Sequence, residues 1–206
     1  MPRSRSAARR PVADGDDRTR QARGQRRRDE IIDAAVELFA RRGFRAGGLA
    51  DLADRVGMTP TGVLYYFGTK DRLLREVVDE RDRIDLAALP VDLRLADLRG
   101  AGAHNARTAT LMRLFVVLAA ESLDRTDPLH GFFVERYAMV RGFFADLIRR
   151  EQELGAVRPE VDADDVATEI VAAILGLEIQ WLMDPTRVDL ATAVAGYVDR
   201  LVESLA

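Results

Sequence analysis

The chain has 206 residues, with 31 basic against 34 acidic side chains, a formal net charge of −3 and no cysteine. The lack of cysteine excludes disulfides, thiol nucleophiles and thiolate metal sites. No apolar run approaches the ~20 residues of a membrane-spanning helix, and the Arg-rich N-terminus lacks the apolar segment of a secretory signal. We therefore expect a cytoplasmic protein with no membrane partner.

The charge is distributed unevenly along the chain. Residues 1–28 contain ten Arg against three Asp, whereas residues 76–206 contain fourteen Arg against twenty-four acidic residues. A polyanion would attract the first segment and repel the second. This asymmetry fits DNA binding at one end of the molecule only.

Residues 1–24 show no apolar periodicity, and we expect them to be disordered in the free protein. They are either a solubilising tail or a basic arm that follows the DNA backbone or enters the minor groove. An amphipathic helix is predicted over residues 25–42, ending at Gly43, with a buried stripe of Ile31, Ala35, Leu38 and Phe39. Arg45 falls in the predicted loop after it, where it is either a phosphate contact or a solvated side chain.

Residues 49–70 predict two short helices that cross over a tight turn. Leu49, Leu52, Ala53 and Val56 supply the apolar face of the first helix, and Gly57 ends it. Thr59 can cap the second helix, and Pro60 suits its first position. A small residue at the crossing, a glycine in the turn and Val63 beyond it are typical of a helix-turn-helix, although a purely structural helical hairpin can show the same pattern. The second helix would enter the major groove.

These residues resemble the N-terminal domain of TetR-family transcriptional regulators. The resemblance runs from about Asp29 to Leu74 and is carried by Gly43-Phe44, Gly57-Met58-Thr59, Val63-Leu64-Tyr65-Tyr66-Phe67-Gly68-Thr69-Lys70 and Leu73-Leu74. It implies a ligand-responsive regulator, usually a repressor. It also implies that the connecting helix from Lys70 to Asp85 moves when a small molecule binds the C-terminal bundle.

Two positions depart from the family pattern. Gly47 and Gly48 stand where the family usually has a Thr or Ser that caps the first motif helix and touches phosphate. Leu64 stands where a Tyr is common, which leaves Tyr65 and Tyr66 for the phosphate contacts.

The predicted recognition helix lacks the side chains that make bidentate contacts to guanine or adenine, because Arg, Lys, Asn and Gln are absent from residues 59–67. We therefore expect specificity to depend on DNA shape and on Arg from the N-terminal arm, with phosphate contacts supplying most of the affinity. The candidate DNA-binding residues are Arg45, Thr59, Pro60, Thr61, Gly62, Tyr65, Tyr66 and Lys70.

The second half of the chain predicts only helices. They are expected over residues 93–98, 105–123, 127–155, 162–184 and 190–205, and the helix over 105–123 is apolar almost all round, which suits the centre of a bundle. The fold class is therefore all-α, with about nine helices in three segments: an arm (1–24), a three-helix DNA-binding domain (25–75) and a ligand-binding and dimerisation bundle (76–206). The apolar stripes of the last two helices favour a homodimer interface there.

Catalytic and metal chemistry find little support in the sequence. His104 and His130 are far apart and fit no metal-ligand spacing, and no strand precedes a phosphate-binding loop, so we expect no cofactor, no metal and no enzyme. A helical enzyme, or a small-molecule-binding protein without DNA binding, is the alternative. The family resemblance implies a pocket in the bundle, for which the candidate lining residues are Arg113, Phe115, Glu121, Tyr137, Phe144, Glu178 and Trp181.

Overall fold

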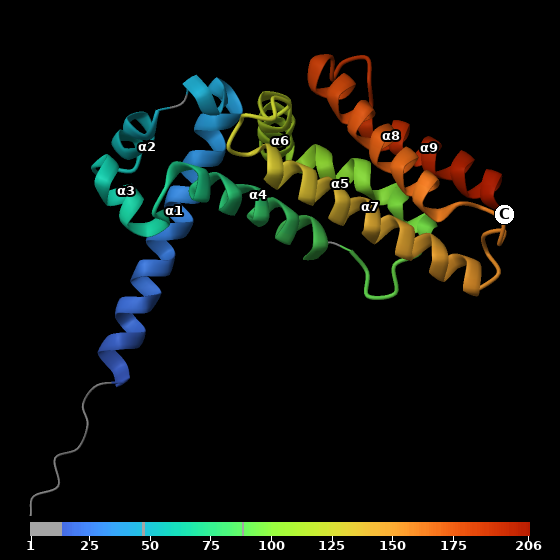
Figure 1. The fold of residues 1–206 in the computed structure, drawn as a ribbon, viewed down its shortest axis with the longest axis horizontal. Helices are drawn as coiled ribbons and strands as arrows, with labels where there is room; N and C mark the ends of the chain where they lie inside the picture. The colour runs from blue at the N-terminus through green and yellow to red at the C-terminus, as the bar shows by residue number, and fades with distance from the viewer. Residues whose placement is uncertain (1–13, 47, 88) are drawn as a thin grey trace, which may run out of the picture.

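The computed structural model describes the backbone of residues 14–46, 48–87 and 89–206, and the side chains of 19–42, 48–80, 82–83, 86–87 and 89–206. Within those residues the fold is all-α, which confirms the expected class (Figure 1). The elements are α1 (Asp14–Ala46), α2 (Leu49–Arg55), α3 (Pro60–Phe67), α4 (Lys70–Ala87), a 3-10 helix η1 (Leu95–Gly100), α5 (Ala101–Arg107), α6 (Ala109–Glu121), α7 (His130–Glu153), α8 (Ala163–Met183) and α9 (Leu190–Leu205).

The first helix is longer than the sequence pattern predicted. It begins at Asp14 instead of Gln25 and ends at Ala46 instead of Arg42, so the prediction of disorder is wrong for residues 14–24, and residues 1–13 lie outside the described part. Extending an existing helix costs no new nucleation, and Arg, Gln and Ala are good helix formers. Arg45 accordingly belongs to the last turn of α1 and not to a loop, and its side chain lies outside the described residues.

The helix-turn-helix follows its local sequence signals closely. Thr59 caps α3 by accepting a hydrogen bond from the N–H of Gly62 at 3.1 Å, and Pro60 is the first residue of that helix. Gly57 in the turn has a φ of 64° and Gly68 after α3 has a φ of 77°, conformations that favour glycine. Gly48 stands at the N-cap of α2 and makes no side-chain capping bond there.

The predicted helix over residues 105–123 is in fact two helices, which meet at Thr108 (φ −105°, ψ 29°). The reason lies in their different partners. A Cβ at Gly102 in α5 would lie 2.5 Å from the carbonyl oxygen of Leu190, so α5 runs in close contact with α9, whereas α6 packs on α1. The short helix expected over 93–98 begins later and is the 3-10 helix η1.

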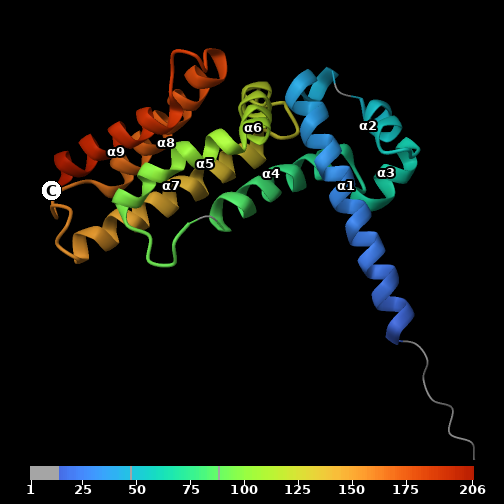
Figure 2. The same ribbon diagram turned by 180° about the vertical axis from the view of Figure 1, so that it is seen from behind.

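Two hydrophobic clusters organise the molecule. The first joins α1–α4 to α6 and to the start of α7, and the second joins η1, the end of α7, α8 and α9. Leu114, Leu118 and Phe133 belong to the first cluster, so the core of the DNA-binding end includes residues from beyond position 75. In Figure 2, α6 stands between α1 and the C-terminal helices. This helix therefore lies at the junction of the two ends, and not at the centre of the bundle as its apolar composition predicted.

Helix α8 contradicts the expectation that no apolar run is long enough to span a membrane. By length and composition α8 could cross a membrane, and only 22% of its most apolar stretch is buried. Single helices of this kind also occur in proteins that never enter a membrane, wherever another surface covers the apolar side chains.

Candidate functional site

Two neighbouring arginines of α1 hold the helix-turn-helix in place, one at the end of α3 and one at the end of α2. Arg28 donates a hydrogen bond to the carbonyl oxygen of Tyr66 at 2.6 Å, pairs with Glu76, and places its guanidinium 4.7 Å from the centroid of the Phe67 ring. Arg27 donates to the carbonyl oxygen of Val56 at 2.5 Å. These bonds satisfy carbonyls at the ends of α3 and α2, which have no acceptor role inside their own helices. The long helix thereby fixes the angle at which α3 is presented.

The outer face of α3 carries small groups and one large ring. Thr59, Pro60 and Thr61 are exposed at its N-terminal end, and Tyr65 is 85% exposed. Tyr66 is half-buried and packs edge-on against the ring of Tyr65, with 5.5 Å between the ring centroids. Val63 and Phe67 on the inner face are buried in the first cluster. The predicted groove-facing residues of α3 thus lie together at one solvent-exposed surface.

Gly62 contributes to this surface by its lack of a side chain. A Cβ at Gly62 would lie 3.2 Å from Cε of Met58 and 3.3 Å from Oγ1 of Thr59. The latter oxygen is the one that caps α3. A larger residue at position 62 would therefore crowd the capping oxygen of Thr59 and displace the exposed surface of α3.

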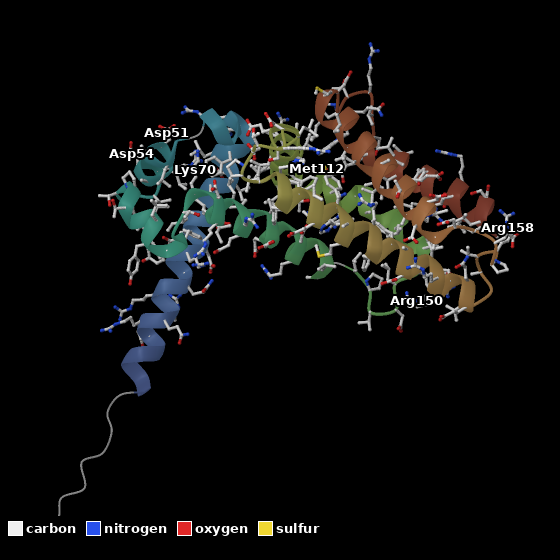
Figure 3. All side chains as sticks on the ribbon, viewed as in Figure 1. Asp51, Asp54, Lys70, Met112, Arg150 and Arg158 are labelled. Atoms are coloured by element: carbon white, nitrogen blue, oxygen red, sulfur yellow. The ribbon has the colours of Figure 1, made fainter. Side chains whose placement is uncertain are left out.

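Lys70 lies at the first turn of α4, beside the crossing of α1 and α4 (Figure 3). Its ammonium nitrogen is 5.8 Å from the centroid of the Phe39 ring in α1. Burial lowers the pKa of Lys70, and the nearby carboxylates of Asp71 and Glu121 act in the opposite direction. The side chain therefore has a packing role inside the protein, and a phosphate contact by Lys70 stays a prediction.

A cavity of about 510 Å³ lies where the two hydrophobic clusters meet. The end of α4, η1, α5, α7 and α8 line it, together with Phe115 of α6. Most of its wall is apolar or aromatic, as in Leu86, Leu98, Tyr137, Met139, Val140, Phe143, Phe144, Ile174 and Leu175. An apolar wall with a few fixed polar groups is typical of small-molecule sites.

Four of the seven predicted lining residues border this cavity: Phe115, Tyr137, Phe144 and Glu178. The other three lie outside it. Arg113 is exposed on α6, Glu121 is the last residue of α6, and Trp181 packs against the second cluster near the end of α8. Ligand binding by any of these residues stays a prediction.

Two polar pairs stand in the cavity wall. Glu178 of α8 is buried and accepts a hydrogen bond from the side-chain amide of Asn105 in α5 at 2.5 Å. Arg136 of α7 is also buried; its Nε donates to Asp82 of α4 at 3.0 Å, and a second nitrogen donates to the other carboxylate oxygen. The same guanidinium lies 4.1 Å from the centroid of the Phe115 ring.

Sequence reasoning missed Arg136, Asp82 and Asn105. A signal for Arg136 was present, since it shares a helical face with Phe133 and Val140, and a charged residue inside an apolar stripe indicates a buried polar site. The pairing with Asp82 gave no local signal, because the two residues are separated by 54 positions. Among the side chains described, no group of three or more His, Cys, Asp or Glu residues could hold a metal ion.

Comparison with known proteins agrees with both halves of this architecture. Residues 31–77 match the family described as bacterial regulatory proteins of the tetR family, and residues 98–206 match the C-terminal domain of BetI-type transcriptional repressors. The transcriptional repressor KstR2 of Mycobacterium tuberculosis is 28% identical over 153 residues, which cover 67% of this chain and 72% of that one. The regulator TtgR of Pseudomonas putida is 26% identical over 204 residues, or 88% and 92% of the two chains.

A solved structure has the same fold. The fatty acid degradation regulator FadR of Bacillus halodurans superposes with a TM-score of 0.74 at 18% sequence identity, and the match covers 86% of this chain and 99% of that one. The C-terminal match alone spans more than half of the chain. The chain is therefore a member of the TetR family of DNA-binding transcriptional regulators.

Proposed function

We propose that this regulator is a cytoplasmic, ligand-responsive repressor that binds a pseudo-palindromic operator as a homodimer. Residues 25–75 would form the DNA-binding domain and residues 76–206 the ligand-binding and dimerisation domain, with α4 (Lys70–Ala87) as the connection between them. The observation that carries the proposal is the Asp82–Arg136 pair, because it joins α4 directly to the cavity wall.

The DNA contact is assigned to the exposed face of α3. Thr61 and the backbone at Gly62 would approach base edges, Pro60 would contact a thymine methyl group, and the hydroxyls of Tyr65 and Tyr66 would donate to phosphates. The exposure of Thr61 and Tyr65 supports this assignment. Thr59 would act by capping the helix that carries these groups.

The homodimer is assigned to α8 and α9. A helix-turn-helix covers one half-site, so a two-fold dimer matches a palindromic operator. Two features support these helices as the interface: most of the apolar stretch of α8 is unburied in the single chain, and Met183 at its end is 81% exposed. Covering an apolar surface of this kind by a second copy would remove it from water.

The effector is assigned to the cavity, as a largely apolar molecule with at least one hydrogen-bonding group. The aromatic wall would cover its apolar part, and Glu178, Asn105 and Tyr137 offer polar partners. An effector that releases DNA must bind the DNA-free conformation more tightly, because coupling between two sites is reciprocal. Movement of α4 through Arg136 and Asp82 would then change the spacing of the two α3 helices.

The proposal is tested by selection from a random-sequence duplex library with the full-length protein, followed by sedimentation of the protein alone. Enrichment of an inverted repeat by a dimeric protein is the expected result. A monomer at micromolar concentration, or a single unrepeated site, would contradict the dimer assignment. No enrichment at all, or turnover of a compound by the purified protein, would favour the alternative of a helical enzyme or a ligand-binding protein.

A further inference from the structure

Helix α1 extends well beyond the part of it that packs. The helix has 33 residues, and Ile31 is the first buried residue among its described side chains, which begin at Thr19. The segment 14–26 therefore continues past the packed part of the helix for about 20 Å, at 1.5 Å per residue. Figure 1 shows this segment projecting past α3, away from the C-terminal helices.

The direction of this projecting segment is fixed relative to α3. The bonds from Arg27 to Val56 and from Arg28 to Tyr66 fasten the base of the segment to the ends of α2 and α3. Since the helix is continuous across this anchor, the segment cannot pivot independently of the recognition helix without breaking backbone hydrogen bonds. The segment is therefore rigid, and its orientation relative to α3 is fixed.

The projecting segment is strongly basic along its length. Residues 18–28 contain six arginines and no acidic residue. Arg20, Arg23 and Arg26 are exposed, and none of the three forms an ion pair with a carboxylate among the described side chains. The nearest acids are engaged by other residues, since Asp29 accepts from Gln25 at 2.8 Å and Glu30 accepts from Arg27 at 2.5 Å.

This arrangement is unfavourable in water without a polyanion. Three like charges spaced three residues apart on one helix repel one another, and no buried apolar residue stabilises the segment in return. Phosphates of a DNA backbone would convert the repulsion into charge-assisted hydrogen bonds. The acidic residues at 14, 16 and 17 lie in the first turn of the helix, where its dipole favours them.

We propose that Arg20, Arg23 and Arg26 form a second DNA-contacting surface, a rigid basic helix that binds backbone phosphates beside the half-site occupied by α3. The inference rests on the proposed DNA contact of α3 and adds contacts outside its footprint. The surface supplies affinity and salt dependence, and it carries no base-specific contact. Its rigidity distinguishes it from a flexible arm, because the phosphates it binds lie at a fixed distance from the half-site.

The test uses the full-length protein and the duplex enriched from a random library, with flanking DNA on both sides. A charge-matched control replaces Arg125, Arg149 and Arg150 by Ala; all three are exposed and lie outside α1–α4, α8 and α9, and Arg150 is at the end of the molecule far from α3 (Figure 3). The triple variant R20A/R23A/R26A is expected to bind about tenfold or more weakly. Its plot of log affinity against log salt should be shallower by about 0.9 for each phosphate that the variant no longer binds. The control should retain the wild-type affinity and slope.

A second variant separates rigidity from charge. Ala22→Pro keeps every arginine but interrupts the helix between Arg20 and Arg23, so that Arg20 is no longer held by the anchored part of the helix. Hydroxyl-radical footprinting should show flanking protection with the wild type, none with the triple variant, and loss of the outermost part of that protection with A22P. Wild-type affinity, slope and footprint in R20A/R23A/R26A would overturn the proposal, and a wild-type footprint in A22P would overturn its rigid form. If the wild-type protein enriched no duplex, the DNA contact of α3 itself would fail, which is a different result.

Discussion

The guanidinium of Arg136 on α7 and the carboxylate of Asp82 on α4 form a two-point ion pair across the wall of the cavity. The Nε–Oδ2 distance is 3.0 Å, and both side chains are largely withdrawn from solvent. Asp82 lies in the helix that begins directly after the recognition helix and its turn. A molecule that displaces Arg136 must therefore either carry Asp82 along or break the pair.

Replacing Asp82 by Asn should destabilise the protein by about 3 kcal/mol, because it leaves the buried guanidinium of Arg136 without its counter-charge. The double variant D82N/R136M removes both charges and should recover part of the loss. Chemical denaturation of the wild type, both single variants and the double variant measures the coupling. Additive effects of the two substitutions would show that the pair transmits nothing between α7 and α4.

The recognition helix offers a test that leaves folding untouched. Tyr65→Phe should weaken operator binding by about 1.5–3 kcal/mol through loss of one hydrogen bond to a charged phosphate. Since Tyr65 is 85% exposed, the melting temperature should not change. Thr61→Ala should cost less affinity than deletion of residues 1–24, which removes several basic side chains. Filter-binding titrations at several salt concentrations decide both comparisons, and a larger loss for T61A would show that α3 supplies more of the operator affinity than the N-terminal segment does.

The helix-turn-helix was predictable because its signals are local. Pro60, the Thr59 cap and the two glycines at positive φ each act within four residues of their own position, and α3 has the predicted bounds. The N-terminal extension of α1 was missed because it has no apolar face. Its helical state depends on continuity with the packed half, which no window over residues 14–24 reveals.

The cavity was only partly predictable for a related reason. Phe115, Tyr137, Phe144 and Glu178 border it, and their helices were all expected. Which face of each helix points inward depends on the break at Thr108 and on the packing of α6 against α1. Both depend on contacts between residues far apart in the sequence. The apolar pattern of one helix does not reveal which other helix it packs against.

The close packing of α5 against α9 depends on Gly102. Gly102→Ala would force a Cβ to within 2.5 Å of the carbonyl oxygen of Leu190 and 2.9 Å of Cβ of Val194, so α5 and α9 must separate. We expect a loss of about 1–3 kcal/mol in stability. Gly100→Ala is the matched control, because a Cβ at Gly100 meets nothing within 4 Å. Equal melting temperatures for the two variants would show that the close approach of α5 to α9 is not required.

A pH-dependent contribution to the free energy of unfolding comes from Glu151, whose carboxylate accepts from the N–H of Leu95 at the edge of the second cluster. Two hydrogen bonds from Arg94, at 2.6 and 2.7 Å, and one from the Leu95 N–H hold the pKa of the buried Glu151 carboxyl below its usual range. A lowered pKa in the folded state gives stability that is fully present above the unfolded pKa of about 4.3 and is lost as the pH falls through the folded pKa.

Glu151→Gln should therefore lower the free energy of unfolding at pH 7 by about 1–2 kcal/mol. The difference from the wild type should shrink below about pH 4.3. Denaturant-induced unfolding of both proteins at pH values from 3 to 7 measures this difference in the free energy of unfolding. A gap of constant size across this range would show that the charge of Glu151 does not contribute to stability.

The most direct test of the central claim is the recovery of bound genomic DNA from cells that express the full-length protein, compared with the variant Y65A/T61A. The account predicts that the wild type enriches a small set of sites sharing an inverted repeat, and that the variant, with an unchanged fold, loses them. Recovery of the same sites by the variant, or of no shared sequence by the wild type, would contradict the assignment of α3 as the element that binds the operator.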